Sequence, residues 1–242
     1  MVFIPKGGRN DYTAAKSYRP ISLASFILKT LERYIRQRVL RDTSLHRNQH
    51  AYLPTRSCIT ALHNLVMAIK EIALAAFMDI EGAFANKHGV DVSITKWINS
   101  MLQSRIIRAN LLSEVREITA TRGCPQGGVL SPLLWSLVVD ELLTKLTQEG
   151  YYIQSYADDI AIVVFGKFPN TVTDLMNRGL REINNWCKKE GLGVNPQKTI
   201  IVPFTRKNLR CIGPVRYQNI NLKLSESAKY LGLTLDRKLT WN

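Results

Sequence analysis

Apolar positions along the chain follow two spacings, which predict a mixture of helices and strands. Intervals of three and four residues, with charged positions between them, predict helices on the solvent boundary of a core. The stretch after Ser131 and Pro132 is the clearest, because serine before proline is a typical helix start. The expected helices cover 27–40, 59–69, part of 92–112, 133–146 and 175–187.

Short apolar runs between turn residues predict strands. The chain begins with an extended entry over 1–5, and its last part, over 222–235, has the pattern of a closing hairpin. Internal strands are expected at 73–80, 115–121, 151–153 and 160–165. Helices and strands mix without a regular βαβ alternation, so the sequence predicts an α+β fold.

The composition suggests what kind of molecule the protein binds. The chain has 242 residues, 45% of them hydrophobic, and a formal net charge of +14. This surplus favours a polyanion, with nucleic acid the first candidate. Both ends of the chain are basic while its middle is nearly neutral, a distribution expected if the centre holds working acids and the flanks hold phosphates. No stretch approaches the roughly 18 apolar residues of a spanning helix, so no membrane partner is expected.

The cysteines argue against a zinc or dithiol site. Cys58, Cys124, Cys187 and Cys211 lie far apart and form no C-x-x-C pair. We interpret them as reduced thiols, which favours an intracellular protein.

Two adjacent acids mark the candidate chemistry. Asp158 and Asp159 lie between two apolar strands, and a turn needs only one aspartate for a bond to its backbone. Two like charges in a half-buried place repel each other unless a cation neutralises them. Asp79, which ends the run 77–80, is a third acid; with substrate phosphates, such carboxylates can hold Mg²⁺. The alternative for Asp79 is an N-terminal cap on a following helix.

Several blocks occur in an order that resembles the reverse transcriptase domain of a non-LTR retrotransposon of the jockey-like, LINE type. Together they extend over nearly the whole chain. The blocks are Tyr18–Leu23, Phe77–Ile80 with Ala83–Phe84, Gly123–Pro132, Tyr156–Asp159 and Tyr230–Gly232.

The resemblance implies a right-hand polymerase with fingers, a palm built on an antiparallel sheet, and no thumb. The fingers would take 1–72 and part of 87–120, and the palm 73–242 with its closing hairpin as a primer grip. The implied activity is RNA-directed DNA synthesis: two-metal transfer of a nucleotide from a dNTP to a primer 3′-hydroxyl on an RNA template.

The same resemblance assigns roles to single residues. The catalytic metal ligands would be Asp79, Asp158 and Asp159. They would bind two Mg²⁺ ions, which Mn²⁺ could replace. Phe84 would stand against the ribose and exclude a 2′-hydroxyl. The other nucleotide contacts would be Lys6, Arg19, Gln126, Gly127 and Lys198, and the contacts with template or primer Arg56, Lys229 and Tyr230.

The implied partners are an RNA template, a DNA primer and dNTP, with action in the nucleus or cytoplasm; the sequence does not indicate an oligomeric state. Nothing in the chain resembles the endonuclease that precedes this domain in such elements, and it ends before a thumb, so we interpret it as a fragment or a degenerate copy. The segments on either side of Asp79 are shorter than the family pattern. Two alternatives therefore stay open: an inactive remnant that only binds RNA, and an RNA-templated RNA polymerase.

Overall fold

The computed structural model describes residues 1–8, 10–14, 17–69, 73–82, 92–103, 105–111, 114–120, 123–205 and 212–240. By their contacts these residues form two compact units, Met1–Ser44 with Ala83–Trp135 and Leu45–Gly82 with Ser136–Asn242. These divisions fall at other residues than the expected boundary between 72 and 73. Which parts are fingers and which are palm stays a prediction.

The described part of the first unit contains two helices, two separate two-stranded ribbons and the first turn of a third helix. In chain order its elements are β1 (Val2–Pro5), β2 (Tyr18–Ile21), α1 (Phe26–Asp42), α3 (Val92–Leu102), β4 (Arg105–Leu111), β5 (Glu114–Ala120) and the first turn of α4 (Ser131–Gln148). β1 pairs with β2 and β4 with β5, both antiparallel. The side chain of Ser25 accepts a bond from the Leu28 N–H and so caps α1.

The second unit is built on a six-stranded sheet. Its strands and helices are α2 (Cys58–Ala68), β3 (Ala73–Gly82), the rest of α4, β6 (Tyr152–Tyr156), β7 (Asp159–Phe165), α5 (Pro169–Glu190), β8 (Leu192–Val194), β9 (Ile200–Phe204), β10 (Arg216–Tyr217), β11 (Ile220–Asn221), β12 (Lys223–Leu224), β13 (Ser227–Tyr230) and β14 (Leu233–Asp236). The order across the sheet is β12-β9-β3-β7-β6, with β8 on the far end of β3. Every pairing is antiparallel except β12 with β9.

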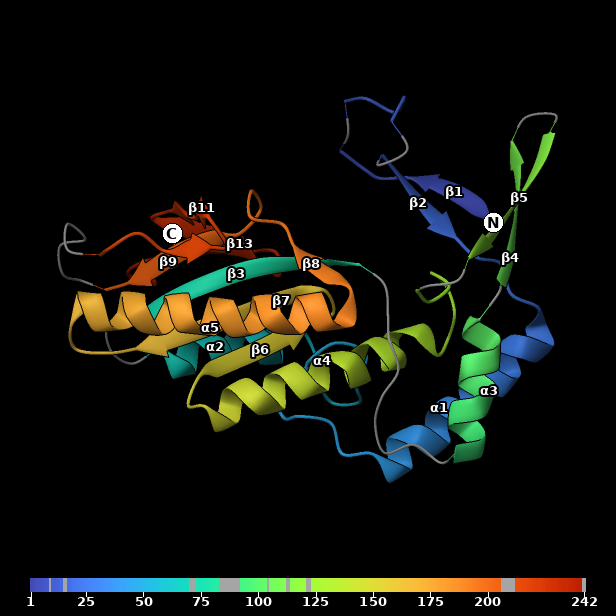
Figure 1. Cartoon of the computed structure of the whole chain (residues 1–242), viewed down its shortest axis with the longest axis horizontal. Helices are drawn as coiled ribbons and strands as arrows, with labels where there is room; N and C mark the ends of the chain where they lie inside the picture. Colours follow the sequence, from blue (N-terminus) through green and yellow to red (C-terminus); the bar gives the residue numbers. More distant parts are fainter. Residues whose placement is uncertain are drawn as a thin grey trace. The chain divides into compact units, whose positions relative to one another are not determined.

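Both faces of this sheet are covered, and β3 is accordingly apolar without interruption from Ala73 to Met78. On one face Ala75 and Phe77 pack with Leu65 of α2 and with Ala228 and Leu235 of the β13–β14 hairpin. On the other face α5 contacts β3 and β7, and Figure 1 shows it running across them. A side chain at Gly179 of α5 would meet Ile162 Cδ1 at 2.8 Å, which shows how closely this helix lies on the sheet.

The predicted elements are present with one exception, and the structure adds strands that were not predicted, namely β2, β8, β10 and β11 as well as β9. The helical pattern within 92–112 ends at Leu102, and the residues after it form β4. β9 has no counterpart among the predicted strands, although it lies beside β3. Ser131 is the first residue of α4, and its hydroxyl donates to Pro125 O at 2.8 Å.

Among the described residues, no helix is both long and apolar enough to cross a membrane. Cys58, Cys124 and Cys187 are free thiols. Burial raises the pKa of the Cys124 and Cys187 thiols to about 12 each, which keeps both protonated at neutral pH.

Candidate active site

The three predicted acids come together at one end of the sheet in the second unit. Asp79 near the end of β3 and Asp159 at the start of β7 are direct register partners. Opposite residues of antiparallel strands point to the same face, with Cβ atoms about 4.5 to 5.5 Å apart. Asp158 lies in the turn just before, where its carbonyl accepts a 3.1 Å bond from the Ile80 N–H. The fold therefore brings together carboxylates that are about a third of the chain apart in sequence.

The charges at this end repel one another. Burial, and after it the charges of Asp158 and Asp79, together raise the pKa of Asp159 to about 6. A cation placed among these groups would favour their ionised forms.

The turn between β6 and β7 presents Asp158 at a conformational cost. Tyr156 pairs with Asp159, so only Ala157 and Asp158 form the turn. Ala157 has φ 54°, in the left-handed region that two-residue hairpin turns require and that glycine occupies most easily. Such outliers often occur at functional sites.

Lys198 supplies a cation from within the chain. The side chain of Asn195 accepts bonds from the N–H groups of Gln197 at 3.0 Å and Lys198 at 3.4 Å, which fixes the turn before β9. From this turn the Lys198 ammonium reaches Oδ2 of Asp79 at 2.6 Å. Sequence reasoning expected Lys198 near a departing pyrophosphate; the observed distance places it beside a proposed metal ligand.

Among the described residues, no group of three His, Cys, Asp or Glu side chains is arranged as a complete metal site. Mg²⁺ does not require one, since it is commonly held by one or two carboxylates together with substrate phosphates and water. The paired Asp79 and Asp159, with the raised pKa of Asp159, fit an ion that arrives with a nucleotide.

The two predicted contact residues of the primer-grip hairpin differ in exposure. Lys229 of β13 is exposed. Tyr230 is only 3% exposed, and its ring lies 5.0 Å from that of Phe77. Its hydroxyl bonds the side chain of Gln154 at 3.1 Å. Tyr230 thus packs beneath the acids and offers no surface to nucleic acid, whereas a contact through Lys229 stays a prediction.

Arg56 holds a loop in the same unit. Its guanidinium donates to the backbone carbonyls of His46 at 2.9 Å and Gln49 at 2.5 Å. The same loop is fixed by Asp140 of α4, which accepts from the His46 N–H at 2.6 Å and from the Gln49 side chain at 2.8 Å. Both bonds from Arg56 are donated by Nη1, so the predicted phosphate contact would have to use other N–H groups of the guanidinium.

The predicted nucleotide contacts of the first unit lie on two connected segments. Ile4 of β1 pairs with Arg19 of β2, and Lys6 follows β1 directly. The end of β2 is joined to the loop before α4, because the Ser22 N–H donates to Gln126 O at 2.7 Å. Gly127 has φ 98°, and a Cβ there would lie 3.1 Å from Ile21 and from Ser22 O. Glycine is therefore required at this position.

Sequence reasoning missed Glu32, which positions this loop. It is 1% exposed on α1, and its carboxylate accepts a 2.6 Å bond from the Val129 N–H. The available signal was an acid on the apolar face of the predicted helix, in line with Ile35 and Val39. The proposed ribose-facing residue, Phe84, lies outside the described residues.

Residues 4–235 match the family described as reverse transcriptase (RNA-dependent DNA polymerase). The chain is 32% identical over 271 residues to the probable RNA-directed DNA polymerase from transposon BS of Drosophila melanogaster, covering 100% of this chain and 30% of that protein. It is 28% identical over 270 residues to the RNA-directed DNA polymerase from the mobile element jockey of the same organism, covering 100% and 29%.

Solved structures agree at the level of fold. Telomerase from Candida albicans in complex with a TWJ fragment of telomeric RNA superposes with a TM-score of 0.54 at 15% identity, covering 88% of this chain and 38% of that one. Apo telomerase from Candida tropicalis gives 0.54 at 12% identity, covering 89% and 40%. The chain spans about 30% of the length of the curated relatives named above.

Proposed function

This chain belongs to the reverse transcriptase family, as a domain of the non-LTR retrotransposon type, and we propose that it extends a DNA primer with deoxynucleotides on an RNA template. The sequence-based resemblance to jockey-like elements is confirmed by the matched relatives. The α+β right-hand polymerase fold is likewise confirmed by the telomerase structures.

The observation that carries the proposal is the register pairing of Asp79 with Asp159, with Asp158 in the adjoining turn. Two Mg²⁺ ions bound there would activate the primer 3′-hydroxyl and neutralise charge on the leaving oxygen. The protein's own part is to hold the carboxylates on one rigid sheet edge, so that the reacting groups need little reorganisation. The raised pKa of Asp159 supports a site completed by an added cation.

Other residues would position the nucleotide. Lys198 would leave Asp79 when a metal ion binds, and it would then donate a proton to the leaving pyrophosphate or stabilise its negative charge. Lys6 and Arg19 would hold triphosphate oxygens. The backbone at Gln126 and Gly127 would contact the incoming nucleotide, and Phe84 would exclude ribonucleotides.

Primer extension tests the activity. The purified chain is incubated with poly(rA), an oligo(dT) primer, dTTP and Mg²⁺, beside the Asp158→Ala variant. Incorporation by the parent and none by the variant supports the proposal. Replacing dTTP by UTP tests the RNA-polymerase alternative, which predicts preferred incorporation of the ribonucleotide.

The competing function is RNA binding without chemistry. It is favoured by the Lys198–Asp79 pair, which neutralises one proposed ligand inside the chain. If neither parent nor variant incorporates dTTP, while circular dichroism shows that both are folded and both bind RNA equally, the binding function replaces the polymerase proposal.

We propose the nucleus as the place of action for either function, by analogy with the family.

A further inference from the structure

The outer face of α5 forms a polar groove together with the β10–β11 hairpin. The groove has a volume of about 770 Å³. Its cationic lining is Arg178 and Arg181 of α5 and Arg216 of β10, and its one acid is Asp174. Amide side chains form much of the remaining wall, including Asn184, Asn185 and Gln218.

The hairpin is fixed to the helix by paired hydrogen bonds. Asn177 of α5 accepts from the Arg216 N–H at 2.8 Å and donates to Pro214 O at 3.3 Å. At the far end Gln218 donates to the Asn184 side chain at 3.0 Å. The Arg216 guanidinium is itself held by Asn221 at 3.0 Å. The groove is therefore a built feature of the second unit, with its walls set before any ligand binds.

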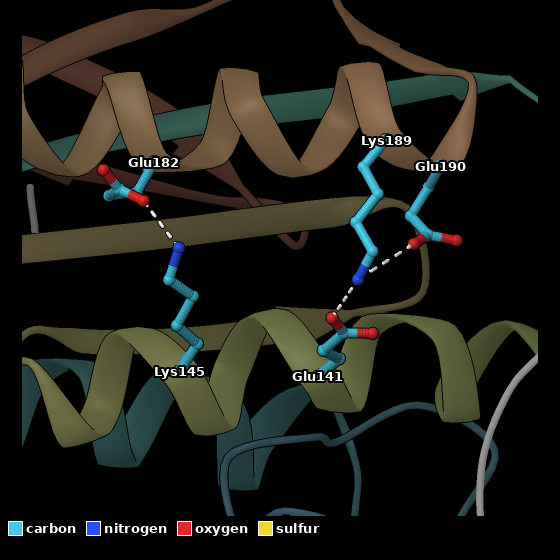
Figure 2. Close-up of polar contacts among 5 residues, drawn as sticks. All are labelled: Glu141, Lys145, Glu182, Lys189 and Glu190. Atoms are coloured by element: carbon cyan, nitrogen blue, oxygen red, sulfur yellow. Dashed lines mark hydrogen bonds and ion pairs between the residues drawn. The ribbon is translucent and has the colours of Figure 1, made fainter.

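The charged side chains on the two sides of α5 differ in whether they form ion pairs. Toward α4, Figure 2 shows Lys145 paired with Glu182 at 2.6 Å, and Lys189 paired with Glu141 and, at 3.7 Å, with Glu190. On the groove side, within the described part of the chain, Arg178 and Arg181 make neither a hydrogen bond nor an ion pair. The groove thus keeps a positive charge that the chain itself does not neutralise.

The groove lies on the opposite side of the sheet from the proposed catalytic acids. Asp79 and Asp159 share the face of β3 and β7 that holds Phe77 and the β13–β14 hairpin. α5 covers the other face, and the groove is on the outer surface of α5. The sheet and α5 therefore both lie between the groove and the acids.

We propose that this groove binds the sugar–phosphate backbone of RNA, in a segment separate from the nucleotides at the catalytic acids. Guanidinium groups suit phosphate oxygens. The amides both donate and accept, as does the 2′-hydroxyl that distinguishes RNA from DNA. The net charge of +14 is consistent with such a partner. The inference deepens the proposed function, since it takes RNA as the bound polymer, but it does not require chemistry.

Fluorescence anisotropy with a labelled 30-nucleotide unstructured RNA, and DNA of the same sequence, tests the groove at 50 to 200 mM salt. The full chain is compared with Arg178→Gln/Arg181→Gln. Its matched control is Arg33→Gln/Arg41→Gln, which removes the same charge from exposed positions of α1. Loss of two phosphate contacts should lower the slope of log affinity against log salt by about 1.4 for a single strand. The control should keep the parent's slope.

The amide wall has its own variant, Asn185→Ala, at an exposed position of α5. This variant should lower the ratio of RNA affinity to DNA affinity and leave the slope of log affinity against log salt unchanged. Arg178→Lys/Arg181→Lys keeps the charge and should keep the slope, which separates lost contacts from a misfolded helix.

Three results would overturn the inference. The first is an equal change of the salt slope in Arg178→Gln/Arg181→Gln and in Arg33→Gln/Arg41→Gln. The second is equal affinity of the parent for RNA and DNA. The third is a salt slope equal to the parent's in folded Arg178→Gln/Arg181→Gln. Primer extension on a short template, run on the same preparations, separates the two proposals. An inactive parent whose RNA binding still depends on Arg178 and Arg181 contradicts only the polymerase. An active parent without that dependence contradicts only the groove.

Discussion

The ammonium of Lys198 lies 2.6 Å from Oδ2 of Asp79, although 119 residues separate the two in sequence. The Asp79 side chain is 26% exposed and that of Lys198 is 56% exposed, so the pair can open toward solvent. An exposed pair of this kind contributes little to stability. We therefore interpret it as a contact that a metal ion and a nucleotide can replace.

Replacing Lys198 by methionine should separate metal binding from turnover. Without the competing ammonium, half-maximal activity should need several-fold less Mg²⁺. At saturating Mg²⁺, kcat should fall by about 10- to 100-fold, because the leaving pyrophosphate loses a proton donor or a charge. Primer extension at graded Mg²⁺ measures both. Lys167→Met, at an exposed lysine before α5, is the control and should change neither; an unchanged Mg²⁺ requirement in Lys198→Met would contradict the displacement.

Asp159→Asn should stabilise the chain in metal-free buffer at pH 7.5. The folded pKa of about 6 lies above the ordinary value of 3.8, so the folded state binds the proton more tightly and parent stability falls as pH rises from about 4 to 6. Asparagine avoids that loss. We expect a gain below about 1 kcal/mol, because solvent screens the repulsion. Urea unfolding with EDTA at pH 4 and 7.5 measures it, and a gain of equal size at both values would contradict a charge effect.

Acid should loosen the loop that Arg56 holds. Burial lowers the pKa of His46 and His50, and Arg56 lowers that of His50 further. The His50 Nδ1 lies 3.0 Å from Thr60 Oγ1, and its buried Nε2 has no partner among the described residues, so a second proton there would lack an acceptor. The unfolded chain takes up these protons first, and stability is therefore lost as pH falls below about 6.5.

The histidine effect can be measured by urea unfolding between pH 7.5 and 5.5. His50→Gln should flatten the dependence of unfolding free energy on pH, whereas His63→Gln, at an exposed position of α2, should leave it as in the parent. The same slope in all three proteins would show that His50 is not responsible.

Gly127→Ala should destabilise the loop before α4. The residue has φ 98°, and the added Cβ would lie 3.1 Å from Ile21 Cγ2 and Ser22 O. Left-handed backbone strain alone costs about 1 to 3 kcal/mol. Thermal unfolding followed by circular dichroism should show the loss, and KM for dNTP should rise. Gly7→Ala is a matched control, because a Cβ there meets no atom within 4 Å; equal effects of the two changes would remove the steric explanation.

Local patterns were sufficient for most elements and for the chemical character of the site. Helical spacing located α1, α2, α4 and α5, because an amphipathic helix repeats its buried positions within a few residues. The acids at 79, 158 and 159 were identified because charges beside buried strands need a reason, and the ordered motifs identified the family, which the matches confirm.

Long-range packing decided what those patterns could not. β9 contains Pro203, which argues against a strand inside a sheet. It is tolerated because β12 pairs only with Ile200 and Ile201 and leaves β9 an edge at the proline. Whether Tyr230 touches nucleic acid or the core likewise depends on what packs over it, and it lies against Phe77 and Gln154.

The sequence by itself thus determined the family and the α+β class and singled out the three acids as candidates, since each of these depends on patterns of residues close together in the chain. Only the tertiary structure decided that Lys198 neutralises Asp79 and that Glu32 holds Val129. It also decided that α5 and the β10–β11 hairpin line one groove with Arg178 and Arg181, which make no ion pair within the described part of the chain. Such contacts join segments far apart in the chain, and burial and pairing energies select them from many that local sequence would allow.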